Sequence, residues 1–367
     1  MNITKEHILK ALSTVEEPDL KKDLVTLNMI KDIELGVGQV TFTVVLTTPA
    51  CPLKDLIRKN CTEAIHRHVG SDLKVTVHMT ADVTSSRLRN TPLLPGVKNI
   101  VAIASGKGGV GKSTVTSNLA VALYQSGAKV GLIDADISGP SIPTMFGAEE
   151  MQPMVTQSPD GKHMISPIRQ YGIKMISIGF LTPAESAVVW RGPMASQALR
   201  QFIADTDWGE LDYLLIDLPP GTGDIHLTLV QTVPVTGVVI VTTPQKVALA
   251  DALKGLAMFR QPQINVPVLG VVENMAYFTP AELPDNKYYL FGKDGGKELA
   301  AKYDVPFLGE IPLVQGIREA GDEGKPAFLN DDPITKNAFR DLAEALAQQV
   351  SVRNANAEKT KRVEVSV

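Results

Sequence analysis

The chain has 367 residues, a formal net charge of −4, 21% charged residues and 44% hydrophobic residues. This length suits two domains, or one large core with an appendage. The nearly balanced charge excludes a global basic field for binding nucleic acid. The sequence has no apolar signal core, no Arg- and Ser-rich transit peptide and no uncharged apolar run of about 18 residues. We therefore expect a cytoplasmic protein with neither membrane nor nucleic-acid partners.

The first 80 residues are predicted to form a small α+β domain. The apolar residues of 4–15 repeat with helical spacing, and two alternating stretches flank Gly36-Val37-Gly38 as in a hairpin. Residues 81–98 turn polar, contain proline and lack periodicity, which predicts a linker. The predicted elements of this domain are helices at 4–15 and 52–68 and strands at 27–35, 39–46 and 73–79.

Apolar strands and helices alternate beyond the linker. This alternation predicts an α/β domain over residues 99–350, a doubly wound and mostly parallel sheet. A hairpin insertion is expected within 151–180, around 158–162, and the polar tail 351–367 is expected to be disordered. The predicted strands are 99–104, 128–133, 213–218, 236–242, 267–272 and 306–311, and the predicted helices are 113–126, 193–205, 224–233, 246–260 and 333–350.

A glycine-rich stretch from Ser105 to Thr114 follows the first strand of this domain and fits the phosphate-binding pattern G-x-x-x-x-G-K-[ST]. Its glycines permit positive φ and close approach to phosphate oxygens, and the next helix adds its positive dipole end. Lys112 would reach the β- and γ-phosphates, and the Ser113 hydroxyl would ligate Mg²⁺. The strand before and the helix after disfavour a plain surface turn. The predicted ATP-binding residues are Gly106, Lys107, Gly108, Gly109, Val110, Gly111, Lys112, Ser113, Thr114 and, later in the chain, Asn274.

The early lysine of this loop, Lys107, is unusual for an ordinary phosphate loop. The stretch K-G-G-V-G-K-S resembles the deviant Walker A motif of the MinD, ParA and nitrogenase-iron-protein class. In that class the early lysine crosses a dimer interface to the partner's nucleotide. The resemblance implies a homodimer with ATP between its subunits and a catalytic role for Lys107 beside Lys112. The alternative is a solvated loop charge.

Two aspartates one residue apart, Asp134 and Asp136, end the predicted strand at 128–133. Buried carboxylates are costly unless they face a cation or water. A strand-end turn followed by a helix cap is the alternative. In the deviant Walker class the acidic pair at this position lies near Mg²⁺ and the attacking water. The resemblance therefore implies that Asp136 organises the water and that Asp134 supports the metal or the loop lysine.

Two further strands end in polar residues. Asp217 ends an apolar strand, as in a Walker B motif that holds Mg²⁺, and the glycines after it would let the backbone follow the γ-phosphate. Asp224 is expected to cap the next helix. Asn274 follows another strand and could hydrogen-bond an adenine edge, although a turn-forming Asn is the alternative.

Together these motifs resemble the Mrp/ApbC family of P-loop ATPases, which carry iron–sulfur clusters to apoproteins. The resemblance covers about residues 97–350. Residues 17–20 and 47–53 also resemble the small N-terminal domain of many such carriers and of other iron–sulfur assembly proteins. The matching motifs are G-K-G-G-V-G-K-S at 106–113, D-A-D-I-S-G-P-S-I-P at 134–143, W-R-G-P-M at 190–194 and D-L-P-P-G-T-G-D at 217–224.

One departure from this family concerns the cluster ligands. Many members carry a Cys-x-x-Cys pair after the stretch that here contains Asn274, and this chain has no cysteine there. Only Cys51 and Cys61 are present, which also argues against a disulfide framework. Cys51 precedes a predicted helix start, where a thiolate is favoured, and could be a lone ligand or transfer thiol completed by a second subunit, glutathione or a client. Cys61 is expected to pack in the core.

The leading hypothesis is a homodimeric, slowly hydrolysing ATPase that binds an iron–sulfur cluster and delivers it to apoproteins, with cluster donors as further partners. An ATP-driven assembly or chaperone factor without its own cluster is the alternative. A MinD- or ParA-like positioning switch is a third hypothesis. The polar tail at 354–362 has no amphipathic face of the kind that a membrane-bound switch needs.

Overall fold

A computed structural model of the protein describes residues 3–85, 87, 93–157, 161–181, 192–280, 282, 283 and 285–363. The chain divides into two compact units. The small unit comprises residues 1–84 and 351–356, and the large unit comprises residues 85–350 and 357–367.

The small unit contains a three-stranded sheet in the order β3-β4-β5. The antiparallel pairing of β3 (Ile30–Gly36) with β4 (Gln39–Leu46) confirms the predicted hairpin. β4 pairs in parallel with β5 (Lys74–Ala81), and α2 (Lys54–His68) forms the crossover that parallel neighbours need. Alternate residues of β4 are buried in one apolar cluster with residues of α2 and of the N-terminal helix. The remaining elements are α1 (Lys5–Leu12), β1 (Glu16–Glu17) and β2 (Lys22–Asp23).

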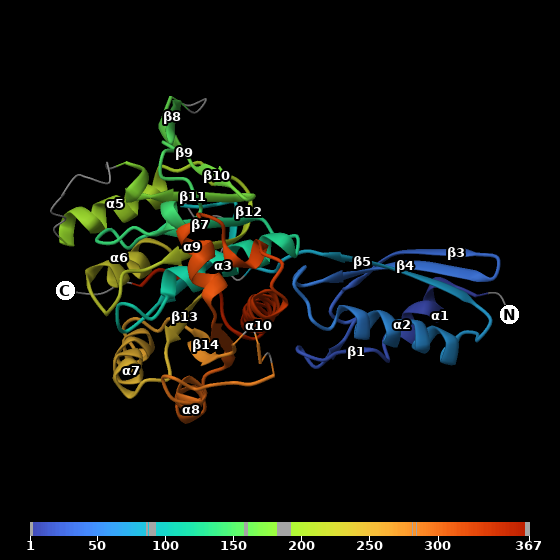
Figure 1. Cartoon of the computed structure of the whole chain (residues 1–367). Helices are drawn as coiled ribbons and strands as arrows, with labels where there is room; N and C mark the ends of the chain where they lie inside the picture. The colour runs from blue at the N-terminus through green and yellow to red at the C-terminus, as the bar shows by residue number, and fades with distance from the viewer. Residues whose placement is uncertain are drawn as a thin grey trace. The chain divides into compact units, whose positions relative to one another are not determined.

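The large unit contains an eight-stranded sheet in the order β10-β11-β7-β12-β6-β13-β14-β15. Helices of the large unit lie around this sheet in Figure 1. All neighbouring pairs are parallel except β10 with β11, which confirms the predicted mostly parallel sheet. The strands are β6 (Val97–Ala104), β7 (Val130–Asp134), β10 (Ile168–Gln170), β11 (Ile173–Ser177), β12 (Leu211–Asp217), β13 (Gly237–Thr242), β14 (Val268–Phe278) and β15 (Phe307–Leu313).

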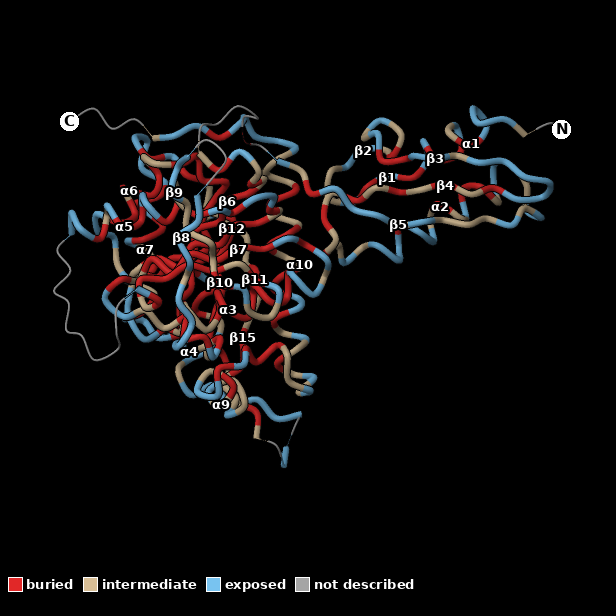
Figure 2. Tube along the Cα trace, turned by 90° about the horizontal axis from the view of Figure 1, so that it is seen from above, coloured by how far each residue is buried: buried red, intermediate tan, exposed pale blue. Residues whose placement is uncertain are grey.

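The centre of this sheet is the core of the unit. The strands β7, β12 and β13 are buried along their whole length or nearly so, because helices cover both faces of the sheet (Figure 2). The helices are α3 (Lys112–Gln125), α4 (Ile142–Met145), α5 (Gly192–Ala204), α6 (Asp224–Thr232), α7 (Lys246–Arg260), α8 (Gly295–Lys302), α9 (Gln315–Asp322), α10 (Pro333–Asn356) and the short 3₁₀ turns Ile178–Phe180 and Ala327–Leu329.

The strand order sets the position of the site. The chain runs from β6 to β7 on one side and later adds β13 on the other side, so the direction of the winding reverses at β6. In open α/β sheets, ligands bind at the carboxyl ends of the strands at such a point. Asp217 at the end of β12 is in register with Asp134 of β7 and with Ile103 of β6. The predicted acidic residues therefore meet beside the glycine-rich loop.

The segment at 151–180 differs in part from its prediction. β8 (Met154–Gln157) and β9 (His163–Ser166) form the expected antiparallel hairpin, while residues 158–160 of its turn lie outside the described residues. β11, in contrast, pairs in parallel with β7 and belongs to the main sheet. The apolar run at 173–178 is the sequence signal for β11, but it is too short to distinguish a strand of the main sheet from a part of the insertion.

The structure contradicts the predicted disorder of the tail for residues 351–356. α10 continues to Asn356, and the Asn354 amide donates to the Thr84 carbonyl at 3.0 Å. Further on, the Val363 N–H donates to the Val230 carbonyl at 2.9 Å. Polar composition predicts disorder, but composition does not encode these long-range contacts of Asn354 and Val363. Residues 364–367 lie outside the described part.

Candidate nucleotide-binding site

The glycine-rich loop joins β6 to α3 and lines a cavity of about 200 Å³. Two of its glycines are required by geometry. A side chain at Gly106 would lie 2.0 Å from the backbone of Asp251 in α7, and Gly111 has a φ of +78°. Gly106 thus allows the loop to pack directly against α7, and Gly111 supplies the left-handed conformation that precedes α3. The lining residues are Ser105, Lys107, Gly108, Gly109, Val110, Gly111, Lys112, Ser113, Thr114, Asp136, Ser141, Met145 and Pro220.

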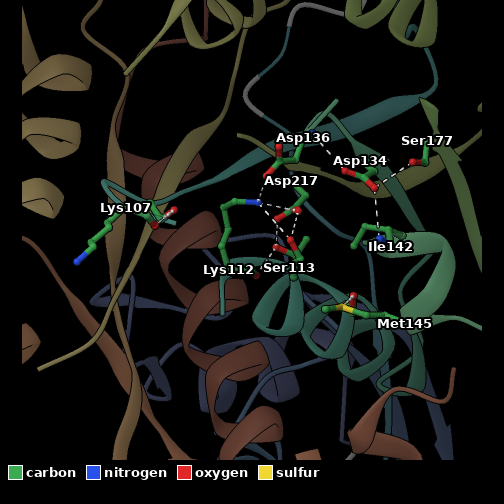
Figure 3. A network of polar contacts seen from close by, with 12 residues as sticks. Lys107, Lys112, Ser113, Asp134, Asp136, Ile142, Met145, Ser177 and Asp217 are labelled. Atoms are coloured by element: carbon green, nitrogen blue, oxygen red, sulfur yellow. Dashed lines mark hydrogen bonds and ion pairs between the residues drawn. The ribbon is translucent and has the colours of Figure 1, made fainter. Parts of the chain in front are cut away.

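Asp217 is the centre of a buried polar cluster (Figure 3). Lys112 Nζ lies 2.7 Å from Asp217 Oδ2, and the Ser113 hydroxyl donates to the same oxygen at 2.6 Å. Thr116, one turn further along α3, donates to the other carboxylate oxygen at 2.7 Å. Asp217 is fully buried, so these three donors offset the loss of its hydration. Thr116 was not predicted from the sequence, where its only signal is its position on the same face of the helix as Lys112.

Asp134 is also fully buried but is held by a different set of donors. The Ser177 hydroxyl of β11 donates to Asp134 Oδ2 at 2.9 Å, and the Ile142 N–H at the start of α4 donates at 3.3 Å. Burial, together with the neighbouring Asp217, raises the pKa of Asp134 to about 8. Asp134 thus links β7 to α4 and β11. Ser177 was missed because β11 was not recognised as a neighbour of β7.

Asp136 faces the cavity, with 16% of its side chain exposed. Its carboxylate lies 3.9 Å from Lys112 Nζ. Burial raises the pKa of Asp136, and the Lys112 ammonium partly offsets this effect. An aspartate that combines partial exposure with a place at the cavity wall can orient a water molecule there.

The charges of this cluster do not balance. The carboxylates of Asp136 and Asp217 lie 3.9 Å and 2.7 Å from the single ammonium of Lys112. The hard oxygen donors of Ser113 and Asp217 lie together beside the cavity and fit Mg²⁺. Within the described residues there is no group of three or more His, Cys, Asp and Glu side chains that could hold a metal alone. In nucleotide sites, phosphate oxygens and water complete the coordination of Mg²⁺, so a cluster of three protein ligands is not required.

Lys107 lies apart from this cluster. Lys107 is among the residues that line the cavity, and its carbonyl accepts a hydrogen bond from Ser105 at 3.0 Å. Its side chain is exposed and points away from Lys112 (Figure 3). Within one subunit the two predicted lysines therefore do not converge.

The segment after Asp217 contacts the loop through its backbone. The Gly221 N–H donates to the Ser105 carbonyl at 2.8 Å. α6 begins at Asp224 with Gly223 as its cap residue, so the prediction that Asp224 caps this helix is wrong. The extended backbone of Gly223 occupies the cap position, and Asp224 lies in the first turn, where a carboxylate suits the helix dipole.

Asn274 ends the regular part of β14 and is buried against the loop. Its side-chain amide donates to the Val110 carbonyl at 2.8 Å. The remaining motif, W-R-G-P-M at 190–194, lies partly outside the described residues, which resume at Gly192.

Comparison with known proteins agrees with this geometry. The profile of a family described as "NUBPL iron-transfer P-loop NTPase" matches residues 96–347, more than half of the chain. The chain belongs to this family. Residues 5–79 match a second family, described as "Iron-sulfur cluster assembly protein". As a P-loop NTPase, the chain has the machinery of a nucleotide-binding and nucleotide-hydrolysing protein.

Relatives of this NTPase resemble it over nearly its whole length. An "Iron-sulfur cluster carrier protein" of Synechocystis is 49% identical over 95% of this chain and 99% of its own. A protein of the same name from Escherichia coli is 43% identical over 92% of this chain and 90% of its own. A solved "nucleotide-binding protein in complex with ADP" from Archaeoglobus fulgidus is 42% identical, covers 65% of this chain and 91% of its own, and superposes with a TM-score of 0.56.

The two cysteines of this NTPase lie in the small unit. Cys61 is fully buried in the apolar cluster, and burial raises the pKa of its thiol to about 12, which agrees with the predicted core role. Cys51 is half-buried just before α2 and packs at the edge of the same cluster. Cys51 is thus the cysteine whose thiol could act as a ligand without unfolding of the core.

Among the described residues, no helix combines the length and the apolar composition that crossing a membrane would need.

His226 of α6 is a buried base that the sequence analysis did not single out. It is 1% exposed, and neither of its ring nitrogens makes a hydrogen bond in the described structure. Burial lowers the pKa of His226 to about 4, although the nearby Gly223 carbonyl offsets part of this effect. In the unfolded chain a histidine has a pKa of about 6.5.

This difference predicts sensitivity to acid. Between about pH 6.5 and pH 4 the unfolded chain binds a proton that the folded protein does not, so His226 lowers the free energy of unfolding by about 3 kcal/mol as the pH falls. We expect His226→Leu to lose this dependence in urea unfolding at pH 7 and pH 4. The exposed His163→Gln should keep it. An unchanged pH dependence in His226→Leu would contradict the prediction.

Proposed function

We propose that this protein is a homodimeric ATPase that carries iron–sulfur clusters and delivers them to apoproteins. The observation that carries the proposal is the convergence of Lys112, Ser113 and Asp217 beside a cavity lined by the glycine-rich loop. The family and the printed names of its relatives support the cargo.

The residues of the cavity suit hydrolysis of ATP by water. The loop N–H groups and the Lys112 ammonium would bind the β- and γ-phosphates and oppose the charge that develops on the γ-phosphoryl group. Asp136 would hold the attacking water through its partly exposed carboxylate. Positioning dominates phosphoryl transfer, so no strong base is required.

Ser113 and Asp217 would hold Mg²⁺. Asp134 would support this site indirectly, because its hydrogen bond from Ser177 fixes the end of β7. A magnesium ion held there would neutralise part of the phosphate charge. Its positive charge would also offset the excess of carboxylates over ammonium groups around Lys112.

The homodimer is proposed from Lys107. Its exposed side chain leaves its own cavity, so it is available to a nucleotide bound by a second subunit. A cation supplied in trans stabilises the transition state of phosphoryl transfer, as arginine fingers do. The proposed composite site is thus formed by Lys112 of one subunit and Lys107 of the partner subunit.

The cluster is the cargo of this ATPase, and Cys51 is its proposed ligand. We expect the wild-type protein, reconstituted anaerobically with iron and sulfide, to show thiolate–iron charge-transfer absorption and to pass the cluster to an apo-ferredoxin. Cys51→Ser should lose both the absorption and the transfer, because iron–sulfur clusters need thiolates. Cys61→Ala is the matched control and should retain both, since Cys61 is buried in the core.

A second candidate function is an ATP-driven assembly factor without its own cluster. The observation in its favour is that the chain has two cysteines and only Cys51 lies outside the core. If reconstituted wild-type protein holds no iron and sulfide while its ATPase activity is intact, this second function replaces the carrier proposal.

A further inference from the structure

The contact between Asn274 and the glycine-rich loop has a consequence for phosphate binding. In an anion cradle the backbone N–H groups face the ligand. In a trans peptide the N–H and the preceding C=O point in opposite directions. The direction of each loop carbonyl therefore decides whether the next N–H faces the cavity.

The Val110 carbonyl is the one that Asn274 fixes. Val110 is 4% exposed and Asn274 is 5% exposed, so water has little access to either group. The Asn274 amide donates to the Val110 carbonyl at 2.8 Å. This bond directs the Gly111 N–H away from β14, and both Val110 and Gly111 line the cavity.

The neighbouring residues show that Asn274 and the glycine-rich loop are in close contact. A side chain at Gly111 would lie 2.2 Å from Asn274 Nδ2, so the amide touches the loop without a gap. Met275 has a φ of +54°, a left-handed conformation that is unfavourable for a residue other than glycine. Such strain persists only where the surroundings over-determine it. The pairing of β14 with β15 also shifts its register between Asn274 and Phe278.

We propose that Asn274 is a positioning residue that holds the 110–111 peptide of the glycine-rich loop in its phosphate-binding orientation. The backbone irregularity of β14 at Met275 lies directly beside this contact. The inference rests on the proposed nucleotide function of the same site. This positioning role differs from an adenine contact by Asn274, because an oriented loop strengthens the binding of every ligand that carries the same phosphates.

The test compares ligands with and without adenine. We expect Asn274→Ala to bind ADP, GDP and inorganic pyrophosphate about tenfold more weakly than wild type in calorimetry, with the same factor for each. A loss confined to ADP would overturn the proposal in favour of an adenine contact. An unchanged affinity for all three would overturn it as well. Wild-type protein that binds none of the three would instead contradict the proposed function.

A second measurement needs no ligand. Amide hydrogen exchange in the apo protein should become faster in the 106–113 peptide of Asn274→Ala and remain unchanged in the β12 peptide. The matched control is Asn99→Ala, which removes another buried amide that donates to a backbone carbonyl, that of Asp212 at 3.2 Å. Unchanged exchange in the loop peptide of Asn274→Ala would contradict the brace.

Discussion

We expect Lys112→Ala to abolish ATP hydrolysis and to lower the free energy of unfolding by about 3–5 kcal/mol. Lys112 is 6% exposed and Asp217 is fully buried, with 2.7 Å between the ammonium and the carboxylate. Removing one partner leaves the other as an uncompensated buried charge, which is the costly case for an ion pair. Phosphate release and urea unfolding measure the two effects.

The double variant Lys112→Ala/Asp217→Asn separates charge from packing. It removes both charges, so we expect it to recover much of the stability while its ATPase activity stays absent. Lys254→Ala breaks an ion pair of similar length, 2.9 Å to Asp251, whose lysine is 74% exposed. Exposed pairs contribute little, so this control should unfold like wild type. Equal stability losses in Lys112→Ala and Lys254→Ala would contradict the buried-pair explanation.

Much of the fold was predictable from local patterns. The buried strands of the large unit have apolar runs, and the helix between Lys246 and Arg260 begins and ends as its periodicity predicts. β11 was missed because a short apolar run next to a hairpin does not reveal its partner strand. The end of α10 was missed because the hydrogen bond from Asn354 to Thr84 joins residues 270 positions apart.

The candidate site was predictable where residue type and spacing encode the chemistry. The glycine loop, Asp134, Asp136 and Asp217 each follow a strand, and the parallel sheet brings these strand ends together. Thr116 and Ser177 carried no such signal, because hydroxyl residues are common and their partners lie on other strands. The direction of the Lys107 side chain required the structure, because the family resemblance implied a role across a dimer interface and the loop sequence alone does not show where the side chain points.

We expect Lys107→Ala to bind ATP with nearly wild-type affinity and to hydrolyse it about 10³- to 10⁵-fold more slowly. The exposed Lys107 side chain points away from Lys112, so it adds little to the cavity of its own subunit. Its proposed effect is on the transition state in the partner subunit's cavity, which lowers kcat and spares binding. The matched control is Lys246→Ala, another exposed lysine, which should keep the wild-type rate.

Mixing variants distinguishes action in trans from action within one subunit. Lys107→Ala keeps a complete cavity, while Lys112→Ala/Asp217→Asn keeps Lys107 but has no working cavity. If Lys107 acts across the interface, a mixed dimer contains one complete site, and an equal mixture should recover about a quarter of the wild-type rate, since half of the dimers are mixed. If Lys107 acted within its own subunit, no subunit in the mixture would contain both Lys107 and a working cavity. The mixture would then hydrolyse ATP as slowly as either variant alone.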